Sequence, residues 1–271
     1  MKSISKKKII QKINTDGLVI IPKLFSNKFC KFIVEYLNNK NSKINLPFSK
    51  VPWGYGNLIN ENNFKKFSNN KLINSICSEF FLNDYEFNHL MVHNKAPWIG
   101  AGIEWHQEIS NINIYGPGCN AKDWKNFLQI YIPLEKQDLE NGCLKFIPKS
   151  HKFGHLKHED IIGDNFTHKR RVTFDIMKKI YSKNGIVNCI LNPGDVIIFN
   201  HLIVHGSASN TGPRSRKAIV LQARSKIKKK NMKIFNKETK YRKKFVENSL
   251  TKIVSDLSKK NLYSDLKRKN S

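Results

Sequence analysis

The chain has 271 residues, of which 39% are hydrophobic and 11% aromatic, and its formal net charge is +27. This composition indicates a globular protein with one sizeable core and excludes a disordered chain. No apolar run approaches the roughly 20 residues of a membrane span, and no apolar stretch follows the lysine-rich start, so we expect neither a span nor a secretory signal.

The positive charge is spread over the chain and comes mainly from lysine. Forty-one lysines stand against seven arginines, and residues 225–271 hold sixteen Lys and Arg but only four Asp and Glu. Phosphate and base recognition favour the arginine fork. Lys, Asn and Ile are abundant together, as a coding bias toward A- and T-rich codons would produce. We therefore expect solvated lysines rather than a nucleic-acid interface.

The cysteines are scattered along the chain, odd in number, and form no C-x-x-C pair. They are Cys30, Cys77, Cys119, Cys143 and Cys189. This pattern is typical of reduced thiols, and it predicts a cytoplasmic protein without structural zinc.

The first eighty residues predict one short strand and two helices. Residues 18–22, "LVIIP", form the strand, and Ser26 then caps an amphipathic helix that runs to about Leu37. Residues 39–68 show little periodicity and are expected to form a loop. Residues 70–81 predict the second helix.

Strand-like runs dominate the chain from residue 85 onward. Clusters of Gly, Pro, Asn and Asp separate runs at 85–95, 102–109, 127–134, 143–148, 185–191, 195–205 and 217–224. Seven strands at this spacing predict a sandwich or barrel. Residues 151–183 are expected to be an excursion over one mouth of the barrel. A single domain, 1–271, is predicted, with its core at about 13–225 and a basic helical extension at 226–271.

The stretch "GIEWHQEIS" places a histidine and a carboxylate two positions apart in a strand-like setting. Residues i and i+2 share one face of a strand, so His106 and Glu108 project together. The later stretch "GDVIIFNHLIVHGS" offers His201 or His205 as a third ligand. Two histidines and one carboxylate form the facial triad of non-haem Fe(II) oxygenases, which leaves metal positions open for a co-substrate and O2.

Arg216 supports this interpretation. It lies eleven residues beyond His205, after a turn rich in Gly, Asn and Pro and at the start of the next strand-like run. A guanidinium suits the distal carboxylate of a chelating keto acid because it offers two parallel donors. Ser207 can add a hydroxyl to the same carboxylate.

Two further pairs at strand spacing are candidates for the wall of a pocket. Gln129 and Tyr131 share one face of their strand and either line the pocket or face solvent. His89 and His93 are expected to be wall residues rather than metal ligands.

Several motifs in this order resemble those of a known family. The stretches "WHQE", "ENGCLKFIPKSHK" and "NPGDVIIFNHLIVHGSASN", followed by Arg216, resemble the phytanoyl-CoA dioxygenase-like family of Fe(II)/2-oxoglutarate oxygenases. The opening "INTDGLVIIPKLFSNKFCKFI" extends the resemblance over about residues 13–224. The family usually has Asp where this chain has Glu108, and a different rotamer can absorb the extra methylene.

The resemblance implies a mainly β fold: a double-stranded β-helix, of the jelly-roll or cupin type, with flanking N- and C-terminal helices. It favours His205 over His201 as the third ligand. The implied iron ligands are His106, Glu108 and His205, and the implied 2-oxoglutarate ligands are Arg216, Ser207 and Asn94. The implied activity is hydroxylation of a small organic molecule, with consumption of O2 and 2-oxoglutarate and release of succinate and CO2.

Two other functions stay open at this point. An oxidative demethylase of nucleic acid would use the same iron and would need a cationic groove beside it. A non-catalytic β-barrel binding module would keep the fold and lose a ligand of the triad. No feature of the sequence indicates an oligomeric state.

Overall fold

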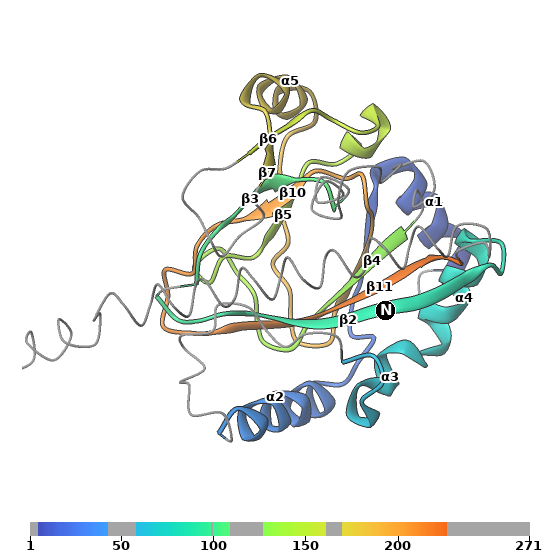
Figure 1. Cartoon of the computed structure of the whole chain (residues 1–271), viewed down its shortest axis with the longest axis vertical. Coiled ribbons are helices and arrows are strands. Elements are labelled where there is room, and N and C mark those ends of the chain that lie inside the picture. Colours follow the sequence, from blue (N-terminus) through green and yellow to red (C-terminus); the bar gives the residue numbers. More distant parts are fainter. Residues whose placement is uncertain (1–4, 43–57, 99, 109–126, 161–169, 227–271) are drawn as a thin grey trace, which may run out of the picture.

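A computed structural model describes residues 5–42, 58–98, 100–108, 127–160 and 170–226 (Figure 1). The helices are α1 (Lys6–Asp16), α2 (Asn27–Ser42), α3 (Lys65–Ser68), α4 (Lys71–Phe80) and α5 (Phe174–Asn184), with 3-10 turns η2 (Asn62–Phe64) and η4 (Ser150–Phe153). The strands are β1 (Leu18–Ile21), β2 (Tyr85–Lys95), β3 (Ile103–His106), β4 (Phe127–Pro133), β5 (Leu144–Phe146), β6 (His158–Asp160), β7 (Arg170–Val172), β8 (Val187–Asn188), β9 (Val196–Asn200), β10 (His205–Ser207) and β11 (Arg216–Ser225).

Two antiparallel sheets form the body of the protein. The larger has the strand order β1-β9-β4-β11-β2, and the smaller has the order β3-β10-β5-β8. Many consecutive strands of the chain lie in different sheets, as in a double-stranded β-helix. A separate ribbon of β6 and β7 lies with α5 at the end of the smaller sheet (Figure 1).

The alternation of side chains along the strands gives the larger sheet two buried faces. Its outer face, with Ile130 and Ile219, packs against α1 to α4 through residues such as Ile13 and Ile33. Its inner face carries Tyr131, Ile197 and Val220 and packs against Leu144 and Phe146 of the smaller sheet. Successive residues of a strand point to opposite faces, and both faces are buried here, so β9 (VIIFN) and β4 (FLQIYIP) are mostly apolar.

Most predicted elements are confirmed within a few residues. The strand at 18–22, the helices at 26–37 and 70–81, and the strands at 85–95, 127–134 and 217–224 are all present. Ser26 caps α2, since its Oγ accepts a hydrogen bond from the Phe29 N–H at 3.3 Å. The loop expected at 39–68 is wrong in part. Helix α2 continues to Ser42, and η2 and α3 occupy 62–68, where Phe64 and Phe67 are fully buried.

Helix α1 is not predicted by the sequence, because only Ile9 and Ile13 mark its buried face. The helix ends at Gly17, whose φ of 86° lies in the left-handed region. A Cβ at this glycine would lie 2.6 Å from the His151 Nδ1. His151 also bonds the Asn14 carbonyl through Nε2 at 3.0 Å, so this histidine anchors α1 to the barrel.

The run expected as one strand at 195–205 is two strands in different sheets. β9 belongs to the larger sheet and β10 to the smaller one. Asn200 makes the turn between them, because its side chain accepts from the Leu202 N–H and its carbonyl accepts from the Ile203 N–H. His201 therefore lies in a turn and shares no strand face with His205.

The excursion expected at 151–183 is present as η4, β6, β7 and α5. It packs beside β3 through a small cluster that contains Ile147, Val172, Ile180 and Val204. The helix expected from about residue 232 lies outside the described residues, so the basic extension and the single-domain boundary stay predictions.

Four of the five cysteines, Cys30, Cys77, Cys143 and Cys189, are buried free thiols, as the sequence predicts. The fifth, Cys119, lies outside the described residues.

Among the helices of the described segments, none combines the length and the apolar character that a bilayer span requires.

Candidate metal centre

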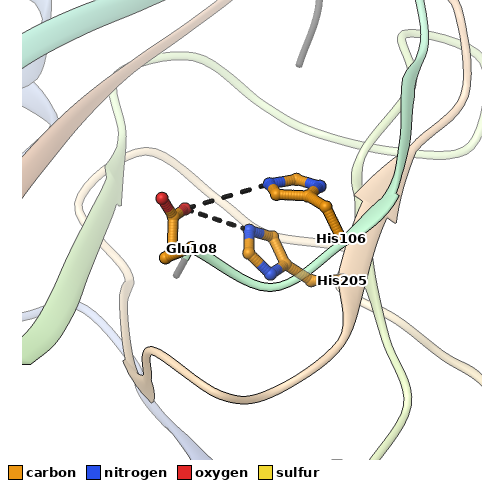
Figure 2. Close-up of side chains that lie close together, drawn as sticks. All are labelled: His106, Glu108 and His205. Carbon is orange, nitrogen blue, oxygen red and sulfur yellow. Dashed lines mark ion pairs between the residues drawn. The ribbon is translucent and has the colours of Figure 1, made fainter. Parts of the chain in front are cut away.

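Three side chains converge between β3 and β10 of the smaller sheet (Figure 2). His106 ends β3, Glu108 follows two residues later, and His205 begins β10 directly opposite His106. The Glu108 Oε1 lies 3.2 Å from the His205 Nε2 and 4.0 Å from the His106 Nε2. One ligand atom from each residue lies within 4.8 Å of the other two, so a single ion can contact all three.

The hydrogen bonds of the two imidazoles orient their Nε2 atoms toward this common point. The His106 Nδ1 lies 2.7 Å from the Glu104 carbonyl, and the His205 Nδ1 lies 3.1 Å from the Ile203 carbonyl. Because a carbonyl only accepts, each neutral ring carries its proton on Nδ1 and keeps a lone pair on Nε2. The donor set fits Fe(II), which two imidazoles and one carboxylate bind on one face.

Glu108 lies beyond the end of β3, and backbone contacts of its neighbourhood hold it in place. Its N–H donates to the His201 carbonyl at 3.1 Å. The preceding Gln107 is fully buried and ties two loops to this strand end. Its amide donates to the carbonyls of Gly154 and Leu202 at 2.8 and 2.6 Å and accepts from the Leu156 N–H at 2.9 Å.

Glu108 stands where the resembled family usually has Asp, and the longer side chain still brings its oxygen to His205. The carboxylate is about one-fifth exposed, whereas both imidazoles are almost fully buried. The accessible side of the site is therefore the carboxylate side.

His201, the alternative third ligand, lies outside this cluster. Its Nδ1 lies 3.1 Å from the Phe127 carbonyl. Burial lowers the pKa of its imidazole to about 4, so the ring is neutral at physiological pH. His201 belongs to the turn that holds Glu108, because its backbone carbonyl accepts from the Glu108 N–H.

Ser207 shares β10 with the ligand His205, Arg216 shares β11 with the cavity-lining Val220, and both offer unused donors. Ser207 is two residues from His205 on β10, and its buried Oγ has no hydrogen-bond partner in the described part of the chain. Arg216 is 1% exposed and donates one bond to the Gly142 carbonyl, while its Nε has no partner among the described residues. An anion bound here would satisfy both groups.

Lys95 is a member of this group that the sequence does not reveal. It pairs directly with Arg216 across β2 and β11, is 4% exposed, and donates to the Ala208 carbonyl. Burial, and then the charge of Arg216, lower the pKa of its ammonium to about 6. In the described segments neither basic side chain has an acidic partner, which is typical of a site for an external anion.

Asn94 does not join this group. Its cross-strand partner is Lys217, whereas the partner of Lys95 is Arg216. Since successive residues of a strand point to opposite faces, Asn94 lies on the face of the sheet away from Arg216. Its Oδ1 is buried and has no hydrogen-bond partner among the described residues.

A cavity adjoins the triad between the two sheets. Besides the three ligands, its lining consists of His93, Ile103, Tyr131, Leu144, Phe199, Gly206 and Val220. The expected wall position of His93 is thus confirmed. Gln129 and Tyr131 are 5% and 2% exposed, so the alternative that they face solvent is wrong.

The chain is similar in sequence to known proteins. The family model for phytanoyl-CoA dioxygenase (PhyH) matches residues 13–218. A phytanoyl-CoA dioxygenase domain-containing protein 1 homolog from Caenorhabditis briggsae is 25% identical over 209 residues, which cover 74% of this chain and 68% of that protein. Phytanoyl-CoA dioxygenase 1 from Oryza sativa subsp. japonica is 30% identical over 158 residues, or 58% of this chain and 51% of that protein.

A solved structure shows the same fold. EctD from S. alaskensis with bound Fe superposes with a TM-score of 0.64 at 16% identity, over 82% of this chain and 77% of that chain. The expected double-stranded β-helix is thereby confirmed.

Proposed function

Because the chain belongs to the phytanoyl-CoA dioxygenase family and is therefore an Fe(II)- and 2-oxoglutarate-dependent dioxygenase, we propose that it hydroxylates a small organic molecule. The observation that carries the proposal is the convergence of His106, Glu108 and His205 on one point. We assign these three side chains as the iron ligands. A non-catalytic binding module is disfavoured because no member of the triad is missing.

The side chains around the triad have distinct roles in this proposal. Arg216, Lys95 and Ser207 bind the distal carboxylate of 2-oxoglutarate. All three are buried, Lys95 pairs with Arg216 across the strands, and Lys95 donates to the carbonyl of Ala208, the neighbour of Ser207. Iron and 2-oxoglutarate, when bound, supply the oxidising chemistry. The apolar wall with Tyr131 and Phe199 excludes water from the reacting C–H bond. We assign no acid or base role to a protein side chain.

Protein loaded with Fe(II) under anaerobic conditions and then exposed to O2 is expected to convert 2-oxoglutarate to succinate. We expect small metabolites to stimulate this turnover and methylated oligonucleotides to leave it unchanged. As a matched control, Lys228, Lys229 and Lys230 changed together to Gln should leave the turnover intact. Stimulation with formaldehyde release from oligonucleotides alone would establish the demethylase instead. DNA binding would decide nothing, since phosphate attraction alone gives a Kd of roughly 10⁻⁴–10⁻⁶ M.

Binding of 2-oxoglutarate is expected to take up a proton at Lys95. The pKa of about 6 leaves this amine mostly neutral at pH 7.5 in the ligand-free protein. A neighbouring carboxylate favours the ammonium, so affinity should fall as the pH rises above 6, by at most about tenfold per pH unit. Calorimetry in buffers of different ionisation enthalpy measures the uptake.

Lys95→Met should abolish this proton uptake. Lys217→Met is the matched control, because Lys217 is also buried but pairs with Glu135 at 3.1 Å on the other face of the sheet. Uptake that persists unchanged in Lys95→Met would contradict the role of Lys95.

A further inference from the structure

The inner face of the larger sheet carries a row of hydrogen-bonding side chains beside the metal cavity. Gln129 of β4 lies directly opposite Gln222 of β11, which lies directly opposite His89 of β2. On its other side Gln129 pairs with Phe199 of β9. Residues directly opposite in adjacent strands share a face, so the four side chains form one row across the sheet.

This row adjoins the metal centre. Phe199 lines the cavity, and its ring centroid lies 5.0 Å from that of His205. Gln129 and Gln222 are each two residues from a lining residue, Tyr131 and Val220, and so point to the same side of the sheet as the lining. The row therefore lies on the inner face directly beyond the residues that line the cavity.

One member of the row, Gln129, is buried in this face. It is 5% exposed, and its buried Oε1 accepts no hydrogen bond from any described residue. A buried amide oxygen without a donor lowers the stability of a fold, so its presence needs a compensating use. An external donor, such as a ligand hydroxyl or amide N–H, would provide one.

A bulge in the sheet adds a second amide at this place. The register of β2 and β11 shifts between Gln222 and Ala223, and Asn88 lies at this bulge. The Asn88 Nδ2 donates to the Gln222 Oε1 at 2.7 Å, which fixes the orientation of the Gln222 amide. Bulges that re-aim a side chain are common next to active sites.

We propose that Gln129, Gln222 and His89 form the primary-substrate subsite, and that it takes a neutral polar molecule with hydroxyl or amide groups rather than an acyl chain. This inference rests on the proposed function. The row has amides and an imidazole but no acid, lysine or arginine. A charged substrate would find no counter-ion in the row, and an alkyl chain would leave the Gln129 oxygen desolvated and unsatisfied.

The test compares two sets of compounds in the stimulation of succinate release by the Fe(II)-loaded full chain. The polar set holds glucose, myo-inositol, N-acetylglucosamine and nicotinamide, and the acyl set holds decanoate and decanoyl-CoA. We expect stimulation by at least one polar compound and by no acyl compound. Stimulation by the acyl set, or by neither set, would overturn the inference.

Gln129→Leu should raise the KM for the stimulating compound on the order of tenfold, since a hydrogen bond is lost. Its melting temperature without ligands should rise by about 2–4 °C, because the unsatisfied oxygen is gone. Leu128→Met, on the opposite face of the same strand, is the matched control and should leave the KM unchanged. A fall in melting temperature with an unchanged KM would show that Gln129 is structural.

The affinities for Fe(II) and 2-oxoglutarate separate this inference from the proposed function. Both should match the wild type in Gln129→Leu. A wild-type protein that binds neither would contradict the proposed function itself. A wild-type protein that binds both, but responds to no polar compound, would contradict only the subsite.

Discussion

His205→Ala is expected to weaken Fe(II) binding more than about 100-fold and to abolish 2-oxoglutarate turnover. The variant leaves one imidazole and one carboxylate at the centre, and the loss of even an outer-shell partner of a metal ligand typically costs 10–100-fold in affinity. His106→Ala should behave in the same way, because both Nε2 atoms face the Glu108 carboxylate. Anaerobic Fe(II) titration and succinate release measure the two effects.

His201→Ala is the matched control for this prediction. His201 is also a buried histidine of the same segment, but its side chain bonds the Phe127 carbonyl and only its backbone carbonyl holds Glu108. Iron binding should therefore survive within a few-fold. If the double variant His106→Ala/His205→Ala still consumed 2-oxoglutarate at the wild-type rate, the assignment of the ligands would be wrong.

The pair His106 and Glu108 could be predicted from local geometry alone, because i and i+2 share a strand face wherever that strand lies. The choice between His201 and His205 as the third ligand could not be predicted from local geometry. It depends on the turn at Asn200, which moves the chain from one sheet to the other between the two histidines. If residues 195–205 formed one continuous strand, His201 and His205 would lie on the same face of it. Only the resemblance to a known family favours His205.

Lys95 shows a different limit of the sequence. It is one of forty-one lysines, and nothing in its neighbours distinguishes a buried lysine from a solvated one. Its role follows from the cross-strand register that places it opposite Arg216, and from its burial. The same register shows why Asn94, one position earlier, points to the other face. A shift of one residue along a strand moves a side chain to the other face of the sheet. A motif match therefore assigns a residue to the site only together with the strand register.

The helical layer was predicted where its apolar spacing was strong and missed where it was sparse. Helix α4 has an Asn70 cap and a clear apolar face, and it lies within a residue of its predicted bounds. Helix α1 presents two buried isoleucines among many lysines, and it is held by its contact with the barrel at Gly17 and His151. Tertiary packing rather than local propensity stabilises such a helix.

Arg216→Ala is expected to weaken 2-oxoglutarate binding by about 30-fold or more while Fe(II) binding survives. Removing one partner of a buried charged pair typically costs about 2–5 kcal/mol, and about 1.4 kcal/mol corresponds to a factor of ten. The guanidinium is almost fully buried and has no acidic partner among the described residues, so the co-substrate carboxylate is the anion that it would meet. Titration of the iron-loaded protein with 2-oxoglutarate measures the loss.

Two further variants separate the loss of this contact from a general loss of structure. Arg224→Ala removes the other arginine of β11, which pairs with Glu86 at 2.6 Å near the far end of the strand, and it should leave the affinity for 2-oxoglutarate unchanged. Arg216→Lys keeps the charge and the bulk but loses the two-pronged donor, so its affinity should lie between those of the wild type and Arg216→Ala. Because Arg216 also bonds the Gly142 carbonyl, the melting temperature of each variant is measured alongside. An unchanged affinity in a folded Arg216→Ala protein would remove Arg216 from the co-substrate site and leave Lys95 and Ser207 as its remaining candidates.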